Sequence, residues 1–241
     1  MNCGHPVFLF CFSLASSTWG QAIFDPPIPI GPNIAGVEQP FLADIDGDGR
    51  KEVILGSTKD GEVIALKLAD DSVVSLIRLM PDMVASAVMD VADLNGDGHP
   101  DILRSRIAGD NANTPPRIAI YLGHGDGTFD DPISIGGSTD YHYVATADLT
   151  GDGHPEIILS GNSVIDVYTF DAATAQIALL REFYLPNVSW NFTTADVTDD
   201  GVTDLVLATS NQWQGHLQVW DATLGPDAPL ITLDSGMGPI G

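Results

Sequence analysis

Cysteine is almost missing from this chain of 241 residues. Its two cysteines, Cys3 and Cys11, both lie near the amino terminus. Disulfide bonds therefore cannot hold the rest of the chain together, and a metal centre built on thiolates is excluded there as well. The fold has to be stabilised by other means.

Basic residues are also few. The chain has 9 lysines and arginines against 33 acidic residues, which gives a formal net charge of -24. Nucleic acids and anionic membrane surfaces would be repelled by this charge, so no nucleic-acid partner is expected. The 44% of apolar residues, spread in short runs, argue against a disordered acidic tail. Cations are the expected counterpart of the acidity.

Long apolar runs are absent too. The run near the amino terminus, residues 7–15, has about nine residues, whereas a membrane-spanning helix needs about twenty, so no transmembrane segment is expected. Gly20 and Ala22 follow it as at a signal-peptidase site, although no lysine or arginine precedes it. Residues 1–22 are therefore predicted to be a signal peptide. Its cleavage would leave a secreted or cell-surface protein without thiols.

What the chain does have is an acidic, glycine-containing loop that recurs at regular intervals. The first aspartates of successive loops are 49, 55 and 48 residues apart, so a unit of about fifty residues is repeated. We number the residues of each loop from one to nine. The four loops are residues 44–52, 93–101, 148–156 and 196–204.

The spacing of oxygen-bearing residues in these loops predicts calcium sites. Calcium takes six to eight oxygen ligands, and a short loop supplies them from alternate positions. Positions one, three and five would offer side-chain oxygens, position seven its backbone carbonyl and position nine a carboxylate, while the glycine at position six allows a positive φ. The predicted ligands are Asp44, Asp46, Asp48, Arg50 and Glu52; Asp93, Asn95, Asp97, His99 and Asp101; Asp148, Thr150, Asp152, His154 and Glu156; and Asp196, Thr198, Asp200, Val202 and Asp204.

Position three distinguishes the first loop from the others. It is Asp46 there and Asn95, Thr150 or Thr198 elsewhere, so the first loop is expected to bind calcium most strongly. Magnesium suits the loops less than calcium because it prefers a tight octahedron. Zinc also suits them less, because no cysteine accompanies His99 and His154. The side chains of these two histidines are expected to point outward. The alternative is that such loops simply form turns. Residues 124–129 lack the remaining acids and are interpreted as a hairpin turn.

Each repeat shows four apolar, β-branched runs separated by glycine, proline, asparagine and aspartate. This pattern predicts an all-β fold, a β-propeller of four-stranded antiparallel blades, in which repeats 36–80, 84–135, 141–184 and 190–233 of a propeller domain 23–241 each form one blade. Residues 171–184 locally favour helix, but the repeat favours a strand. Residues 23–31 resemble a fourth strand and residues 235–241 the start of a first one, so the chain is expected to be an incomplete part of a ring of six to eight blades.

The runs 41–49 and 91–102 resemble the FG-GAP/VCBS repeat family, whose members include the propeller of integrin α subunits. The hairpin 121–129 is also similar to that of the family. The resemblance extends from about Gly36 to the carboxyl terminus and implies a β-propeller that binds calcium in the loops between the first and second strands. It implies no single activity, because the family includes adhesion modules, lectins and non-catalytic parts of polysaccharide-degrading enzymes.

The function predicted first is therefore a secreted or cell-surface module for adhesion or for binding a protein or carbohydrate ligand. Its ligand would lie at the face opposite the calcium loops, where Trp213 is the candidate contact; buried packing between blades is the alternative for such an aromatic residue. A polysaccharide lyase or hydrolase is the second hypothesis, although the chain has no GxSxG, HExxH or phosphate-loop motif. The third is a structural spacer in a larger surface protein. The oligomeric state is left open.

Overall fold

The computed structural model describes nine stretches of the chain, which together contain sixteen strands. They are residues 39–57, 62–69, 72–80, 86–106, 117–136, 141–161, 164–184, 188–211 and 214–233. The predicted signal peptide, Trp213 and the segments 23–31 and 235–241 lie outside them. No helix within these stretches is long and apolar enough to span a membrane.

The first two repeats each form one antiparallel sheet of four strands, with the strands side by side in chain order. The first sheet consists of β1 (Phe41–Ala43), β2 (Glu52–Gly56), β3 (Val63–Ala69) and β4 (Ser72–Met80). The second consists of β5 (Ser86–Ala92), β6 (Asp101–Arg106), β7 (Arg117–Tyr121) and β8 (Ile133–Gly136).

The last two repeats have the same topology. The third sheet consists of β9 (Tyr141–Ala147), β10 (Glu156–Gly161), β11 (Val164–Asp171) and β12 (Gln176–Tyr184). The fourth consists of β13 (Val188–Ala195), β14 (Asp204–Asn211), β15 (Gln214–Trp220) and β16 (Ile231–Leu233).

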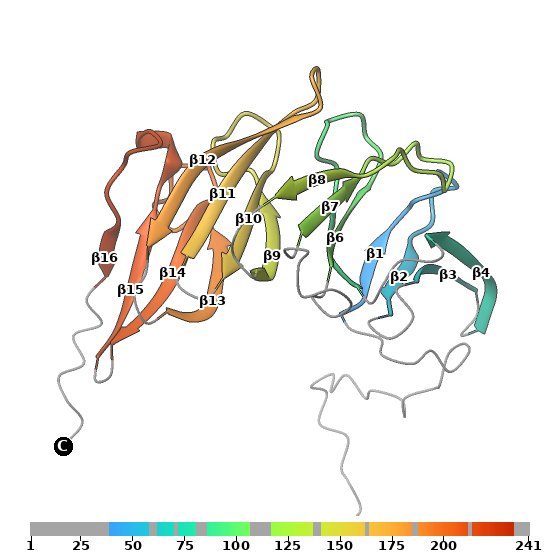
Figure 1. The fold of residues 1–241 in the computed structure, drawn as a ribbon, viewed down its shortest axis with the longest axis horizontal. Coiled ribbons are helices and arrows are strands. Elements are labelled where there is room, and N and C mark those ends of the chain that lie inside the picture. The colour runs from blue at the N-terminus through green and yellow to red at the C-terminus, as the bar shows by residue number, and fades with distance from the viewer. Residues whose placement is uncertain are drawn as a thin grey trace, which may run out of the picture.

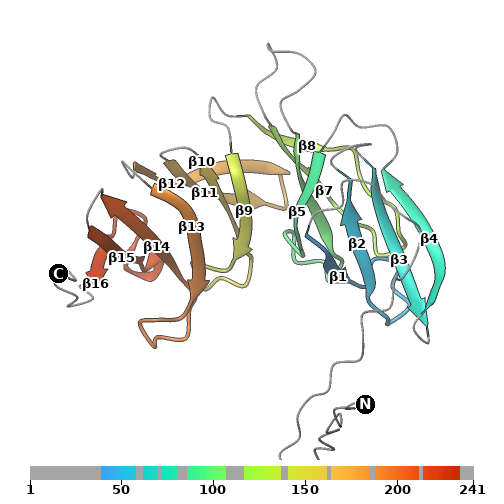
Figure 2. The same ribbon diagram turned by 90° about the horizontal axis from the view of Figure 1, so that it is seen from below.

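The four sheets follow one another in chain order along an arc, as Figures 1 and 2 show. The first strands of neighbouring sheets contact each other, β1 with β5, β5 with β9 and β9 with β13. In every sheet the acidic loop joins the first strand to the second, so all four loops lie at the same end of the strands. This arrangement is that of propeller blades, which confirms the predicted fold class.

Most of the predicted strands agree with the observed ones, and the segment with helical propensity forms β12 as the repeat required. The apolar run 129–135 predicts the last strand of the second sheet, but that strand begins at Ile133, because Phe129 closes the hairpin through an isolated bridge to Gly123. A short 3-10 helix, Ala222–Leu224, follows β15 and was not foreseen; Asp221 caps it by accepting a hydrogen bond from the Thr223 N–H.

The hydrophobic core lies between the sheets and is divided into three clusters. Each cluster draws buried side chains from two neighbouring sheets, so no sheet buries its apolar faces by itself. The cluster between the third and fourth sheets contains the large, fully buried side chain of Trp220, whose ring meets that of Phe183 edge to face with centroids 5.2 Å apart.

The acidic loops take part in these cores through their second residue. Ile45, Leu94 and Leu149 occupy position two of the first three loops, and each is buried in the cluster shared with the following sheet. In the fourth loop this residue is Val197, which is 48% exposed. The conformation of each of the first three loops is thus coupled to the packing of one sheet against the next.

One polar contact ties the first strands of the second and third sheets together. Oδ2 of Asp90 on β5 accepts hydrogen bonds from the backbone N–H and the hydroxyl of Thr146 on β9, at 2.7 and 2.8 Å. Burial raises the pKa of the Asp90 carboxyl, and the bonds from Thr146 oppose that rise. This is a directional link between sheets that are otherwise joined by apolar contacts.

The Trp220 cluster yields the first prediction. Trp220→Ala is expected to lower the free energy of unfolding by about 3–5 kcal/mol, because it removes a large, fully buried side chain from the core between two sheets. Trp220→Phe should cost clearly less, since the indole Nε1 has no hydrogen-bond partner within the described part of the chain. Urea unfolding followed by far-UV circular dichroism measures both values. Equal stability of the alanine variant and the wild type would contradict the assigned core.

Candidate metal centre

The four acidic loops share one pattern of backbone hydrogen bonds. Position one accepts a bond from the N–H of position six, at distances of 2.8, 2.8, 2.9 and 2.9 Å in chain order. Position five accepts one from the N–H of position seven, at 2.9, 2.8, 2.8 and 2.9 Å. The glycine at position six has the expected positive φ, between 85° and 90°. The side chains at positions one and five therefore hold the turn that places them.

Position nine is a fully buried carboxylate in every loop: Glu52, Asp101, Glu156 and Asp204. Each of these carboxylates accepts a hydrogen bond from the N–H of position two, at 3.1, 2.8, 2.8 and 2.8 Å. Position two is the residue that enters the core in the first three loops. The predicted last ligand of each site is thus also the group that ties its loop to the sheet.

The second oxygen of the position-nine carboxylate is used differently from loop to loop. Oδ1 of Asp101 accepts a bond from the N–H of Gly123 at 2.8 Å, which ties the second loop to the hairpin beyond β7. In the third and fourth loops the position-three hydroxyl approaches it, with Thr150 at 3.3 Å from Glu156 and Thr198 at 3.4 Å from Asp204. Oε1 of Glu52 is buried and has no hydrogen-bond partner among the described residues.

Burial makes three of these carboxylates, Glu52, Asp101 and Glu156, hard to ionise. It raises the pKa of Asp101 to about 6, although the N–H groups of Gly123 and Leu94 oppose the rise. Burial also raises the pKa of Glu52 and that of Glu156 above their ordinary values. A divalent cation next to such groups would favour their charged form.

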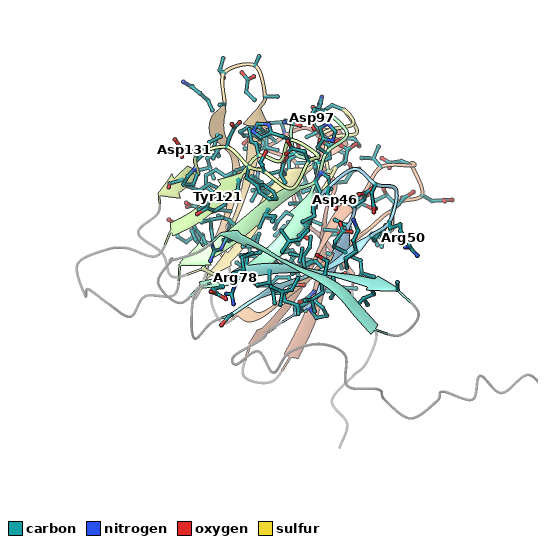
Figure 3. All side chains as sticks on the ribbon, turned by 90° about the vertical axis from the view of Figure 1, so that its right-hand side faces the viewer. Asp46, Arg50, Arg78, Asp97, Tyr121 and Asp131 are labelled. Atoms are coloured by element: carbon teal, nitrogen blue, oxygen red, sulfur yellow. The ribbon has the colours of Figure 1, made fainter. Side chains whose placement is uncertain are left out.

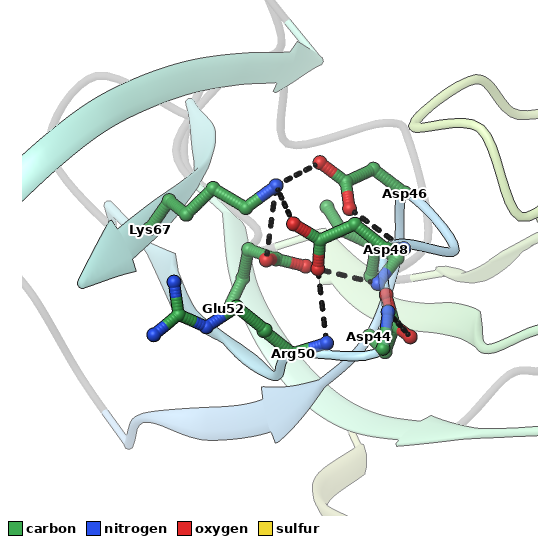
Figure 4. A network of polar contacts seen from close by, with 8 residues as sticks. Asp44, Asp46, Asp48, Arg50, Glu52 and Lys67 are labelled. Atoms are coloured by element: carbon green, nitrogen blue, oxygen red, sulfur yellow. Dashed lines mark hydrogen bonds and ion pairs between the residues drawn. The ribbon is translucent and has the colours of Figure 1, made fainter. Parts of the chain in front are cut away.

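The first loop has two features that the others lack. Asp44, Asp46 and Asp48 form the one group of three acidic side chains in the described residues whose oxygens lie within 4.8 Å of one another. The Lys67 ammonium on β3 lies 2.6 Å from Oδ2 of Asp46 and 2.6 Å from Oδ2 of Asp48, and 3.9 Å from Oε1 of Glu52 (Figure 4). Its bonds to Asp46 and Asp48 raise the pKa of Lys67 and, in turn, lower that of Asp48.

Sequence reasoning missed Lys67 because it lies fifteen residues beyond Glu52, outside the loop motif. The signal was present in the register. Val53 pairs with Leu66, which places Lys67 opposite Glu52 at the end of the sheet where the loop lies. Asp46 of the first loop and Asp97 of the second lie toward this same end in Figure 3.

The side chains at position seven lie against neighbouring glycines. A Cβ built on Gly96 would stand 2.6 Å from Cε1 of His154, and one on Gly151 would stand 2.9 Å from Cγ2 of Val202. Gly125, in the hairpin after β7, has the His99 ring in the same place. The side chains of His99 and His154 were expected to point outward. His154 is exposed and His99 half-buried, and they lie against Gly96 of the second loop and Gly125 of the hairpin, so their expected part in a metal site is limited to the backbone carbonyl.

The first loop contacts the hairpin of the second sheet in a similar way. The Gly127 N–H donates to the Ile45 carbonyl at 2.8 Å, and a Cβ on Gly47 would stand 2.7 Å from the Gly125 carbonyl oxygen. The hairpin itself is closed by a 3.0 Å bond from the His124 N–H to the Thr128 carbonyl, as predicted for this segment. The acidic loops and this hairpin therefore form a continuous row along the sheets.

The donor set fits a hard divalent cation. Each loop carries carboxylates at positions one, five and nine of one short segment, and oxygen ligands of this kind are those that calcium prefers. In the first loop, Oδ1 of Asp44 and Oε1 of Glu52 are buried without hydrogen-bond partners in the described stretches. Buried carboxylate oxygens without a donor are costly, and a cation would relieve that cost.

The candidate ligand contacts at the opposite end are described only in part. Trp213 lies outside the described residues. Tyr143, on β9, is 42% exposed and packs edge to face on Phe192 of β13, with ring centroids 5.1 Å apart. Tyr141 is buried and donates a 2.5 Å hydrogen bond to Asp166, so it contributes to the interior of its sheet.

The arrangement of sheets and loops defines the class of this protein as a β-propeller with an acidic loop in every blade. The model of the FG-GAP-like repeat matches residues 44–104 and 93–159. This match supports the resemblance to the FG-GAP-like repeat family that the loop motif indicated. No curated protein matches the chain.

Among solved structures, the chain is similar to an Agrocybe aegerita lectin that recognises non-reducing terminal N-acetylglucosamine. The TM-score is 0.55 at 22% identity over 77% of this chain, and the chain spans about half, 49%, of the length of the lectin. This likeness supports the propeller fold. A weaker likeness is to BBS1N in complex with ARL6DN, with a TM-score of 0.48 at 10% identity over 83% of this chain and 56% of that chain. Another is to the V. cholerae biofilm matrix protein Bap1, with a TM-score of 0.38 at 20% identity over 78% of this chain and 38% of that chain.

The contact between the first loop and the hairpin can be tested with two glycines. Gly47 and Gly49 both have positive φ, 71° and 85°, but only Gly47 faces a backbone carbonyl at short range. Gly47→Ala should therefore destabilise the protein by about 1 kcal/mol more than Gly49→Ala, which introduces backbone strain alone. Thermal unfolding of both variants measures the difference. Equal losses would contradict the loop packing.

The raised pKa of Asp101 predicts a dependence of stability on pH. Because the folded-state pKa is about 6 instead of 3.8, the ionised form costs stability at pH 7, and this cost is lost as the pH falls through 6. In chelator, lowering the pH from 7 to 5 should stabilise the wild type by about 1 kcal/mol more than Asp101→Asn, which does not titrate. Urea unfolding at both pH values measures the difference. Parallel pH profiles would contradict the assignment.

Proposed function

We propose that this chain is a calcium-stabilised, ligand-binding propeller module that works outside the cell or at its surface. The observation that carries the proposal is the fourfold repetition of one loop geometry with a buried carboxylate at position nine. A neutral side chain could also accept the position-two N–H, so that hydrogen bond alone does not require an acid. A cation provides a reason for the acid to recur.

The residues that would hold calcium are the side chains at positions one, three, five and nine and the carbonyl at position seven. When bound, the ion supplies positive charge that offsets the mutual repulsion of the carboxylates in one loop and so favours their ionised form. The buried acid then keeps position two in the core between sheets. At free calcium tenfold above the dissociation constant, mass action stabilises the fold by about 1.4 kcal/mol per site.

Ligand binding is inferred for the end of the strands opposite the loops. Strand β9 runs from Tyr141 toward the third loop, so Tyr143 lies near the opposite end. An exposed aromatic ring at the junction of two blades suits a sugar ring or an apolar side chain. The lectin with a related fold recognises terminal N-acetylglucosamine, which makes a glycan the ligand class to test first. Trp213 remains a predicted contact in the same role.

An extracellular location is part of the proposal. The support comes from the sequence, through the predicted signal peptide at residues 1–22 and the lack of cysteine beyond it. Millimolar calcium outside cells would keep sites of moderate affinity filled. The role proposed is binding and not catalysis, because the acids that recur in the sequence are engaged in holding the loops.

A glycan array probed with the full chain, in calcium and in chelator, tests the proposal. Binding to terminal N-acetylglucosamine or another glycan is expected in calcium, with a clear fall in chelator as the fold loosens. Tyr143→Ala should weaken that binding by about tenfold, whereas Tyr184→Ala, an exposed tyrosine on the outer strand β12, should leave it unchanged.

Three results would count against the proposal. An unchanged melting temperature between calcium and chelator, without heat of binding in calorimetry, would remove calcium from it. The absence of binding to glycans and to surface proteins would favour a spacer. Release of oligosaccharides from a polysaccharide incubated with the chain would show an enzyme.

A further inference from the structure

The first acidic loop contains a cation that belongs to the chain itself. Lys67 is the one basic residue in the described stretches that forms ion pairs with a predicted metal ligand, and it does so with Asp46 and Asp48 at 2.6 Å each. Its side chain is 20% exposed, so the ammonium is partly withdrawn from water. Charge-assisted bonds of this length are the strong ones.

The ammonium overlaps the place predicted for calcium, because it lies next to three of the four side-chain ligands of that site. The ion would need oxygens of positions three, five and nine at about 2.3–2.6 Å. The Lys67 ammonium lies within 4 Å of an oxygen from each of these positions, Asp46, Asp48 and Glu52. An ammonium and a calcium ion cannot share the same oxygens at such distances, so binding of the metal requires that Lys67 leave.

The charge at the ligand positions supports the same conclusion. The first loop has four carboxylates there, because position three is Asp46, whereas each of the other loops has three. Lys67 reduces the net charge of the first site to that of the others. The extra acid, which was expected to make this the strongest calcium site, is instead bonded to the lysine.

The register shows that this is particular to the first blade. Lys67 is opposite Glu52, as follows from the pairing of Val53 with Leu66. The residues opposite position nine in the other blades follow from the same count and are Leu122, Thr169 and Asp221. None of them carries a positive charge.

We propose that the Lys67 ammonium is the resident cation of the first loop, which therefore keeps its shape without metal and binds calcium more weakly than the other three loops. The inference rests on the proposed calcium binding of those loops. It reverses the order of affinities expected from the number of carboxylates alone. The first blade would then stay folded at calcium concentrations that leave the remaining loops empty.

Lys67→Thr tests the proposal, because threonine is the residue at the equivalent place in the third blade. In calcium, native mass spectrometry should detect one additional bound ion per molecule compared with the wild type. Calorimetry should show that the first loop binds calcium about tenfold more tightly in the variant than in the wild type. In chelator, this variant should melt at a lower temperature than the wild type. Lys51→Thr, at the exposed position eight of the same loop, is the matched control for loss of one charge and should change neither value.

Two further variants keep the test decisive. Lys67→Arg retains the positive charge and should bind as many ions as the wild type. Asp46→Asn combined with Lys67→Thr removes the extra acid together with the lysine, so it should fold in chelator and gain the ion even if the single variant does not fold.

Equal numbers of bound ions in the wild type and in the Lys67→Thr variants would overturn the proposal. If the number of bound ions is equal in both proteins and above zero, calcium binding by the loops is supported and only the proposed role of Lys67 is wrong. If it is zero, calcium binding by this propeller fails as well.

Discussion

The structure depends on the hydrogen bond that the N–H of position two donates to the buried carboxylate of position nine in the same loop. It is present in all four loops, at 2.8 to 3.1 Å. In the first three loops the same position-two residue carries the side chain that enters the core between sheets. Loop conformation, strand pairing and the packing of neighbouring blades are therefore joined at one peptide group.

This coupling explains why charge is placed where a soluble fold normally avoids it. An ionised carboxylate without exposure to solvent is costly, and burial accordingly raises the pKa of Asp101 to about 6. The backbone N–H groups of Leu94 and Gly123 offset part of the cost at Asp101. In the proposed function a metal ion offsets the rest of this cost, and in the first loop the lysine opposite Glu52 takes the place of the metal ion.

Sequence alone predicted the blades and the loops because both are local patterns that repeat. The strands around each loop, such as β2 and β10, begin at the residue where the acidic motif ends. The sequence did not reveal Lys67 or the contact of His154 with Gly96, because both depend on residues brought together from different strands or different blades. The 3-10 helix after Trp220 also went unnoticed, since it occurs in one blade and has no counterpart by which the repeat could signal it.

The link from Asp90 to Thr146 gives the array a property that its apolar cores cannot supply. Methyl and aromatic surfaces attract each other with little regard to direction, so two sheets joined by them alone could slide along their strands at small cost. A carboxylate that accepts both the amide and the hydroxyl of one residue is satisfied at a single offset. These hydrogen bonds therefore fix the position of the second blade relative to the third along the strand direction. They also fix the relative position of the acidic loops at the ends of the two blades.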